Sequence, residues 1–402
     1  MDNNNNNNNN SEAYTSCTVY CYKLKSVQNT SPAYLNSQRA CILNDSTSLV
    51  ASGNRLFRID VQFPKQVVKN FTKIKGIPTP IILEDGAIKE TSIDIATNTH
   101  IKREIQSVVS NNDYSRVGVI DSHGAAAILD SEFKTLYSLP PVPSAVDSGW
   151  SGISFDPKDS SLVATTRHFE RQLHLYKGDQ LLTSFPLQNN PTQVLHVRES
   201  LIAVTENNQL NIYDIRTNKP AHLQKFALTP EPLYTLSASV DGVNVGVGGA
   251  ARSFAVYDSR KWTNIGTWAS CLKYEVSYSH FSEKHSDVVY LSGLDSEILA
   301  GEWDGSGVAN HFSGLRVDSR WVGVSKLKGQ ESLFGMTSSG NIYYVHDADR
   351  LYTPPPVTLK HNLKPQHNKE KKKPKKDQQQ PQQAQQAPPQ QQQQDHDMDA
   401  QL

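Results

Sequence analysis

The sequence has few of the residues from which metal or disulfide sites are built. Only four of its 402 residues are cysteines, and Cys17, Cys21, Cys41 and Cys271 show no paired metal-ligand spacing. Cys17 and Cys21 are four residues apart in an expected strand, which places them on one face but far apart along it. We therefore expect four reduced thiols, buried or half-buried, as is typical of a cytosolic or nuclear chain.

Long apolar runs are also missing. No stretch reaches the roughly 18 apolar residues expected of a membrane span, and the N-terminus has no apolar segment of the kind that secretory signals carry. Basic and acidic residues both number 40, so the chain has no formal net charge. Before residue 353 the chain is mildly acidic, which is not typical of a nucleic-acid reader. We expect no membrane partner and a nuclear or cytoplasmic location.

Glycine is concentrated in one stretch, GVNVGVGGAARSFAVYD (242–258), which contains Gly242, Gly246, Gly248 and Gly249. A phosphate-binding loop would need a strand before it and a helix after it, because the helix N-terminus holds the anion. The β-branched and aromatic residues that follow predict a strand instead, and no Lys-Ser or Lys-Thr pair is present. The glycines are therefore predicted to be packing residues in a strand and its hairpin.

Short apolar-rich runs with similar endings recur along the chain. The steps from Asp214 to Asp258, from Asp258 to Glu302 and from Glu302 to His346 are 44 residues each. A period of this size with several short strands per unit predicts a β-propeller, whose four-stranded units bury their faces only against neighbouring units. We expect seven third strands, at 55–60, 125–130, 172–177, 209–214, 253–258, 297–302 and 341–346.

The predicted fold is all-β: a seven-bladed β-propeller of four-stranded antiparallel blades over residues 14–352. The last blade lacks a fourth strand of its own, because a proline run follows its third strand. TSCTVYCYKL (15–24) is expected to supply that strand and close the ring, which removes exposed sheet edges. The gap from 60 to 130 is too long for one unit. It fits an insertion at 72–104, which we favour, or an eighth blade around LEDGAIKE (83–90).

The two ends have compositions that cannot bury a core. An asparagine run and a glutamine- and proline-rich tract predict disorder for residues 1–13 and 353–402. A lysine cluster in the second segment is expected to act as a nuclear-import signal; a weak, salt-sensitive contact to nucleic acid or a solubilising spacer are the alternatives. Its lysines are Lys369, Lys371, Lys372, Lys373, Lys375 and Lys376.

Several motifs resemble those of WD-repeat β-propellers. Tyr-Asp at 213–214 and 257–258 stands where the family has Trp-Asp, LSGLDSEI (291–298) is similar to its Ser-Gly-x-x-Asp-Gly turn, and FDPKD (155–159) is similar to its Phe-Ser-Pro-Asp turn. The resemblance covers roughly 14–352. No unit begins with Gly-His or ends in Trp-Asp, so the family's buried Asp-His-Ser-Trp hydrogen-bond set is expected to be mostly absent. Apolar packing is then expected to define the blades.

A second motif concerns a ligase. YDIR and YDSR end two consecutive units, and the resemblance to WD-repeat substrate receptors of cullin-RING ubiquitin ligases implies that Asp214, Arg216, Asp258 and Arg260 dock the ligase adaptor. The alternative interpretation is structural, because an arginine at this place commonly pairs with a nearby carboxylate.

Catalytic motifs have little support. None of the 13 histidines forms a His-Glu-x-x-His pair. GWSGI (149–153) differs from the Gly-x-Ser-x-Gly elbow in the place of its second glycine, and no helix is expected after it. DSH at 121–123 is local sequence, whereas triads are defined by geometry. No catalytic residue, metal site or cofactor is predicted, and a hydrolase that uses the propeller channel is kept as an alternative.

The sequence thus predicts a non-enzymatic scaffold. Loops on a rigid ring would bind partner proteins, with the blades supplying a pre-organised surface. The expected partners are proteins, within a multi-subunit complex. The lysine-rich tail favours a nuclear or ribonucleoprotein-related assembly, with a cytosolic scaffold as the other location.

Overall fold

The computed structural model describes residues 17–27, 34–64, 78–141, 149–216, 221–227, 230–304 and 313–352. The predictions for residues 1–13 and for 353–402, with the six lysines, lie outside the described residues. Two single 3₁₀ turns, η1 (Asp85–Ala87) and η2 (Ala348–Leu351), are the only helical segments among the described residues. The described part of the chain therefore contains no helix that could cross a membrane.

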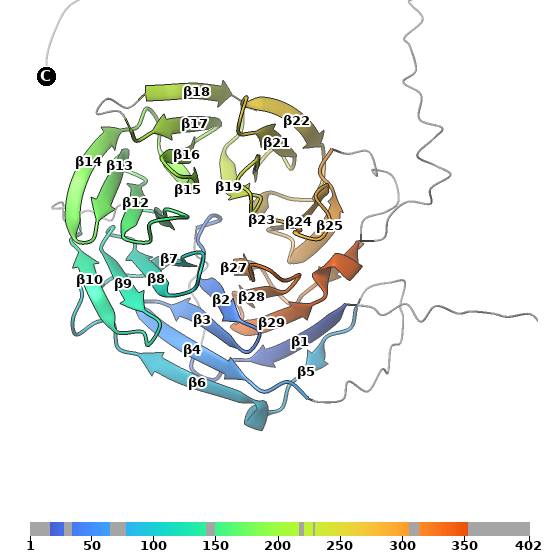
Figure 1. Cartoon of the computed structure of the whole chain (residues 1–402). Coiled ribbons are helices and arrows are strands. Elements are labelled where there is room, and N and C mark those ends of the chain that lie inside the picture. The colour runs from blue at the N-terminus through green and yellow to red at the C-terminus, as the bar shows by residue number, and fades with distance from the viewer. Residues whose placement is uncertain are drawn as a thin grey trace, which may run out of the picture. The chain divides into compact units, whose positions relative to one another are not determined.

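Seven antiparallel sheets surround a central axis as the blades of a propeller, as predicted (Figure 1). Blade 1 consists of β2 (Ala40–Asn44), β3 (Thr47–Ser52), β4 (Arg55–Val61) and β6 (Ile88–Ile93). Blade 2 consists of β7 (Ile105–Ser110), β8 (Arg116–Asp121), β9 (Ala126–Asp130) and β10 (Thr135–Leu139). Blade 3 consists of β11 (Ser151–Phe155), β12 (Leu162–Arg167), β13 (Gln172–Lys177) and β14 (Gln180–Pro186). Blade 4 consists of β15 (Pro191–Arg198), β16 (Leu201–Glu206), β17 (Gln209–Asp214) and β18 (Ala221–Ala227). Blade 5 consists of β19 (Leu233–Ala238), β20 (Asn244–Gly249), β21 (Phe254–Asp258) and β22 (Thr263–Trp268). Blade 6 consists of β23 (Val276–Phe281), β24 (Val288–Gly293), β25 (Glu297–Glu302) and β26 (Ser313–Arg316). Blade 7 consists of β27 (Trp321–Lys326), β28 (Leu333–Thr337), β29 (Asn341–His346) and β1 (Thr18–Lys23), to which β5 (Ile81–Ile82) is added.

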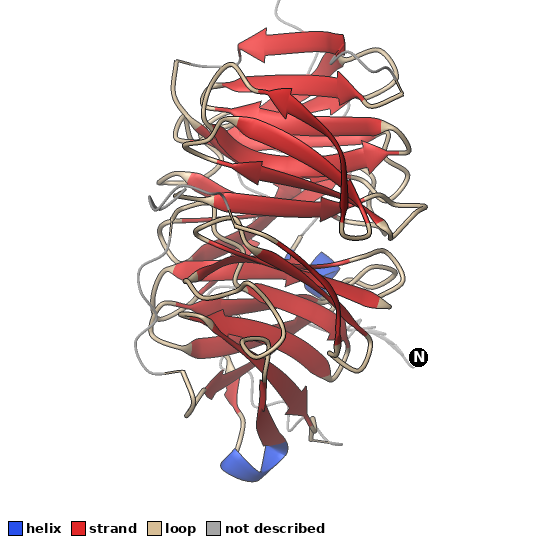
Figure 2. Cartoon of the chain, turned by 90° about the vertical axis from the view of Figure 1, so that its left-hand side faces the viewer, coloured by secondary structure: helices blue, strands red, loops and turns tan. Residues whose placement is uncertain are grey.

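The first strand of each blade lies innermost, and the inner strands of neighbouring blades pack side by side around the axis. Tight hairpins join the strands at the two faces of the ring (Figure 2). Turn residues with positive φ occur where these hairpins need them, for example Asn207 at 54° and Gly340 at 81°. All seven predicted third strands are confirmed, as β4, β9, β13, β17, β21, β25 and β29.

The ring closes through β1, as expected. β1 pairs antiparallel with β29 over six residues, from Thr18 opposite His346 to Lys23 opposite Asn341. β5 then pairs in parallel with the other edge of β1, so the closing strand has a partner on both sides. The described residues of the long gap after β4 form no eighth blade. Residues 88–93 are β6, the fourth strand of blade 1, so the segment predicted as an insertion at 72–104 contains a strand of that blade, and its described part also contains β5 and η1.

The glycines of 242–258 are packing residues, as predicted. Gly246, Gly248 and Gly249 belong to β20, the second strand of blade 5. A Cβ on Gly249 would lie 2.2 Å from the carbonyl oxygen of Pro232, and one on Gly246 would lie 2.1 Å from the ring of Phe254. The chain therefore has glycine where the backbone or an aromatic ring of the same blade approaches most closely.

Tryptophan packs against glycine in several blades. Trp150, Trp262, Trp268 and Trp321 are at most 7% exposed, and Trp303 is partly buried. A Cβ on Gly301 would lie 2.4 Å from the ring of Trp268, with the same arrangement for Gly152 and Trp150 and for Gly335 and Trp321. Four of the five tryptophans are thus part of the core rather than of a binding face.

Buried polar sets also hold the blades, so the expectation that apolar packing alone defines them is corrected. Tyr213 in β17 donates to Glu206 at the end of β16, and the other carboxylate oxygen of Glu206 accepts the backbone N–H groups of Gln188 and Asn189. Asp121 in blade 2 accepts four backbone N–H groups in the same manner. Acidic side chains therefore join inter-blade connections to hairpins without the Asp-His-Ser-Trp set.

Candidate functional site

The ring has two faces, which we name by the inner strands. The start face holds the beginnings of the inner strands, the hairpins between second and third strands and the connections between blades. The end face holds the hairpins between first and second strands and the connections from third to fourth strands. The central channel runs between these faces and is walled by β2, β7, β11, β15, β19, β23 and β27.

The chain itself occupies the channel at the start face. The segment from Tyr34 to Arg39, which we call the plug, leads into β2 and forms a parallel bridge between Gln38 and Ser107 of β7. Gln38 N–H donates to the carbonyl of Gln106 at 2.9 Å, and Arg39 N–H donates to the carbonyl of Val322 at 3.0 Å. The plug is thus hydrogen bonded to inner strands of blades 2 and 7.

Side chains of three further blades hold the plug. Trp150 and Gln193 both donate to the carbonyl of Asn36 at 3.0 Å, and Tyr278 donates to the carbonyl of Ser37 at 2.7 Å. The Arg39 side chain is fully buried and forms an ion pair with Glu104. The plug could not be predicted from the sequence, because isolated main-chain contacts to a distant strand leave no periodic pattern.

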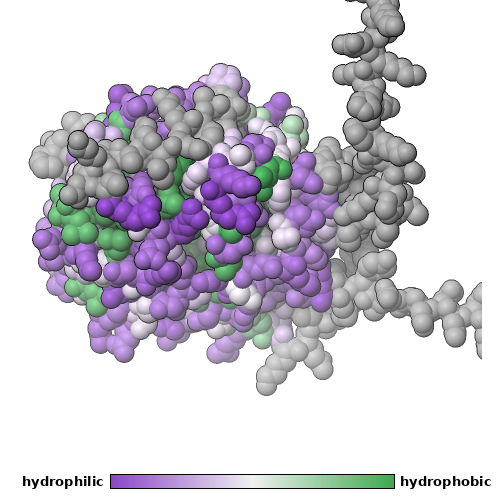
Figure 3. Space-filling view, turned by 45° about the horizontal axis from the view of Figure 1, so that its top comes forward, coloured by the Kyte–Doolittle hydropathy of each residue, from purple (hydrophilic) through white to green (hydrophobic). Residues whose placement is uncertain are grey.

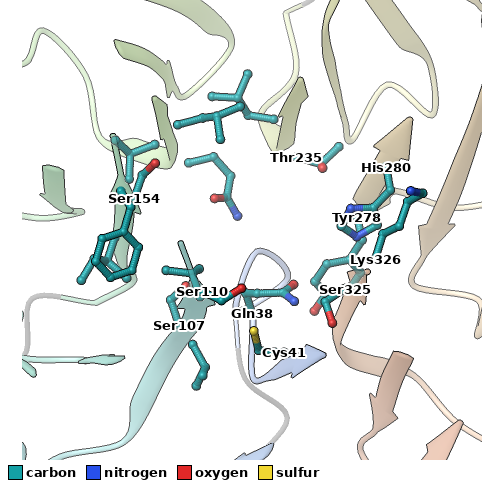
Figure 4. Close-up of a pocket in the computed structure, with 18 of the residues that line it drawn as sticks. Gln38, Cys41, Ser107, Ser110, Ser154, Thr235, Tyr278, His280, Ser325 and Lys326 are labelled. Atoms are coloured by element: carbon teal, nitrogen blue, oxygen red, sulfur yellow. The ribbon is translucent and has the colours of Figure 1, made fainter. Parts of the chain in front are cut away.

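Below the plug lies a cavity of about 300 Å³ with both polar and apolar residues in its lining. Figure 4 shows Ser154 on one side of it, Tyr278, His280, Ser325 and Lys326 on the other, and Gln38 and Cys41 between them. Many of its hydroxyl groups already join neighbouring inner strands. The Ser279 hydroxyl, for example, bonds to Thr235 and Ser237, each at 2.8 Å. These hydroxyl groups therefore contribute to the seams between blades.

The cavity carries little charge. Burial lowers the pKa of His280 to about 4 and also lowers the pKa of His196, so both imidazoles are neutral at physiological pH. Lys326 is the one ammonium group of the lining, and its Nζ lies 2.8 Å from Glu283. A neutral site of this kind offers hydrogen bonds but no strong attraction for a charged ligand.

The described cavity lining does not assemble a catalytic set. Ser154 and His196 approach to 3.4 Å, but the Ser154 oxygen already accepts the backbone N–H of His196. The other ring nitrogen, Nε2 of His196, has no hydrogen-bond partner among the described residues, so no carboxylate is hydrogen bonded to it as the acid of a triad would be. No group of three metal-ligating side chains occurs in the described parts of the chain.

The predicted docking residues lie on the end face of blades 4 and 5. Arg216 and Arg260 have side chains that are 73% and 62% exposed, and each forms an ion pair with the aspartate two residues earlier, Asp214 or Asp258. The local pairing expected on structural grounds is therefore present. Each pair also holds its arginine at the same place on adjacent blades, because both follow the third strand. Docking itself stays a prediction.

The start face carries large exposed side chains around the plug. Tyr34, Phe169 and Tyr274 are 44%, 62% and 43% exposed, respectively. Tyr34 begins the plug, Phe169 lies in the hairpin between β12 and β13, and Tyr274 lies in the connection to β23. Elsewhere polar side chains cover most of the visible described surface, with apolar ones in small separate patches (Figure 3).

Comparisons with known proteins agree on the fold. A chain in the crystal structure of a mitotic checkpoint complex superposes with a TM-score of 0.60, covering 86% of this chain and 96% of that chain at 12% sequence identity. Many structures share this architecture, since 1690 chains match. No family model and no curated protein matches the sequence. The chain is thus a seven-bladed β-propeller, and the comparisons identify its fold alone.

Proposed function

We propose that this protein is a WD-repeat-type scaffold that binds partner proteins through the start face of its ring. The observation that carries the proposal is the set of Tyr34, Phe169 and Tyr274, three aromatic side chains that are exposed at the start of the plug, on a hairpin and on a connection of the start face. Aromatic residues, tyrosine above all, are enriched at the energetic centres of protein interfaces. The chain that superposes on this one comes from a multi-protein complex, which is consistent with such a role.

A pull-down with a tagged full-length chain and quantitative mass spectrometry tests the proposal. Replacing Tyr34, Phe169 and Tyr274 together by alanine should remove the stoichiometric partners, since single anchors contribute about 2 kcal/mol or more. The matched control replaces Leu182 and Ile265, which are 48% and 41% exposed on the outer strands β14 and β22. Partners that survive the triple substitution and are lost in the control would place binding on the outer rim.

We further propose that the lysine-rich segment directs the protein to a nuclear assembly. The support is compositional, because six lysines within 369–376 form a cluster of the kind that import receptors read. A chain ending at Tyr352 should keep its partners in a lysate but lose nuclear accumulation in cells. Unchanged nuclear fluorescence of the shortened chain would contradict this assignment.

Docking to a cullin-RING ligase adaptor is a second candidate function. Arg216 and Arg260 support it, because both guanidinium groups are exposed at equivalent places on adjacent blades and are fixed by aspartates. Replacing both arginines by alanine should abolish co-purification of an adaptor while the melting temperature stays within a few degrees. An adaptor that is absent from the wild-type sample would exclude this function.

A further inference from the structure

A polar cluster on the outer rim of blade 3 has the arrangement of a nucleophile, a base and an orienting acid. Ser184 in β14 lies directly opposite His174 in β13. The Ser184 Oγ and the His174 Nδ1 are 2.7 Å apart, and the His174 Nε2 lies 3.3 Å from Oε2 of Glu170. The serine is exposed and the histidine is buried, so the hydroxyl faces solvent while its partner is held in place.

The carboxylate of Glu170 determines which nitrogen of the His174 ring carries the proton. Hydrogen bonds from His174, followed by the charge of the nearby Arg167, lower the pKa of Glu170 despite its partial burial. Glu170 is then a carboxylate, which can only accept, so Nε2 of His174 carries the proton. The lone pair on Nδ1 is left to accept the hydroxyl proton of Ser184. This division of roles is the one that an activated serine requires.

A buried arginine anchors the cluster to the neighbouring blade. Arg167 contacts Glu170 at 3.1 Å and donates to the backbone carbonyls of Gly124 and Pro140, which belong to blade 2. The same carboxylate oxygen of Glu170, Oε2, is therefore contacted by both a guanidinium group and an imidazole. The acid and the base are fixed by packing, which is how catalytic geometry is pre-organised.

Because β14 lies at the edge of its sheet, one of its backbone N–H groups can donate a hydrogen bond to the negative charge that develops on a substrate carbonyl oxygen. Leu187 N–H donates to the carbonyl of Arg171, and hydrogen-bonded positions alternate along an antiparallel pair. By that alternation the backbone N–H of Ser184 points away from β13. β14 is the outermost strand of its sheet, so this N–H faces the side from which a substrate would approach. A backbone N–H on the nucleophile itself is one element of an oxyanion hole.

We propose that Ser184, His174 and Glu170 form a second functional site, a serine nucleophile that attacks activated acyl groups such as small esters. In the first step the Ser184 Oγ forms a bond to the carbonyl carbon while its proton passes to Nδ1 of His174. The bond to the leaving alkoxide then breaks, and the alkoxide takes that proton. Water next attacks the acyl carbon and gives one proton to Nδ1 of His174. That proton returns to the Ser184 Oγ as the acyl–oxygen bond breaks, which releases the carboxylic acid and the free serine. Glu170 acts as a positioning residue.

The channel does not share this arrangement, which separates the new site from the hydrolase considered in the sequence analysis. There, Nε2 of His196 has no hydrogen-bond partner among the described residues, and Ser154 is buried. The rim site is also independent of the proposed scaffold role, because none of its three residues belongs to the aromatic set of the start face.

A fluorophosphonate probe tests the proposal directly, since it bonds covalently to activated serines. Incubation of the full-length protein should label Ser184, as located by mass spectrometry of the digest. His174→Gln should slow labelling at least 100-fold and Glu170→Gln about tenfold, as expected for loss of a base and of its orienting group. Hydrolysis of p-nitrophenyl acetate by the same samples should follow the same order.

The matched control is Ser92→Ala, which removes an exposed serine on the outer strand β6, opposite Phe57 rather than a histidine. This variant should be labelled at Ser184 like the wild type, and Ser184→Ala should lose the adduct. Circular dichroism melting of each variant separates lost chemistry from lost fold. Absence of a Ser184 adduct in the wild type, or an equal rate in folded His174→Gln, would overturn the proposal.

Discussion

Individual residues carry constraints that the repeat pattern alone does not reveal. Gly249 is in a strand, where glycine is unfavourable for chain entropy, yet the carbonyl oxygen of Pro232 would lie 2.2 Å from any Cβ. The same carbonyl accepts the N–H of Ala250, which fixes the connection into β19 against the end of β20. The sequence indicated a packing glycine here, but only the structure identifies its neighbour.

We expect Gly249→Ala to destabilise the protein by about 2 kcal/mol or more, because backbone atoms cannot move aside as a side chain does. Gly86→Ala, where nothing lies within 4 Å of the new Cβ, should change the free energy of unfolding by less than about 0.5 kcal/mol. Urea titrations of both variants measure the difference. Equal urea midpoints for the two variants would show that the backbone around Pro232 can shift at little cost in free energy.

His280 makes the fold sensitive to acid. Burial lowers its pKa from 6.5 to about 4, so between these values the unfolded chain binds a proton that the folded chain does not. The free energy of unfolding therefore falls as the pH falls from 6.5 towards 4, by up to about 3 kcal/mol from this residue. His280→Gln should flatten that dependence in urea titrations at pH 7, 6, 5 and 4, and a parallel pH profile would contradict the assignment.

At the scale of elements, the plug differs from every strand of the ring. A strand is recognised in sequence by alternation and by its turn residues, and those signals located all seven third strands. The plug has one bridge and side-chain bonds to distant blades, among them Gln193 and Tyr278. Such contacts depend on where the ring brings remote residues together, so local pattern cannot predict them. The cluster at Ser184 is local, but it depends on the register that places His174 opposite Ser184, which the repeat pattern does not fix.

The plug should open more easily when its side-chain donors are removed. Tyr278→Phe combined with Gln193→Leu deletes two hydrogen bonds to plug carbonyls, at about 1 kcal/mol each. Hydrogen exchange of the Gln38 and Arg39 amides should then be roughly 30-fold faster. Amides of β17 serve as the internal control and should exchange at the wild-type rate. Unchanged exchange at Gln38 would mean that these two side-chain hydrogen bonds do not hold the plug.

For the whole molecule, closure of the ring depends on β1. Val19, Tyr20 and Tyr22 are at most 5% exposed there, and burial of such side chains contributes about 1.5–3 kcal/mol each. The sequence was sufficient to predict this closure, because a blade short of one strand and a strand without a blade complement each other. It did not predict β5, whose two residues are too short for a pattern.

Deleting residues 17–24 should leave the chain largely unfolded or aggregated, since the loss approaches the whole stability of a typical domain and exposes the edge of β29. A chain that begins at Tyr14 should melt like the full-length protein. Adding a synthetic 14–27 peptide to the deleted chain should restore cooperative melting in calorimetry. A soluble deleted chain with wild-type melting would show that six blades and a three-stranded seventh suffice.

Pairing of β1 with β29 also determines when the ring can close during synthesis of the chain. A ribosome makes β1 more than 300 residues before the strand that it pairs with, so the earliest strand of the ring is among the last to find its place. Until then its apolar side chains have no permanent partner, and the growing chain is a natural client for chaperones. Synthesis of the seventh blade, rather than of the first, is the moment at which the nascent protein becomes able to complete its fold.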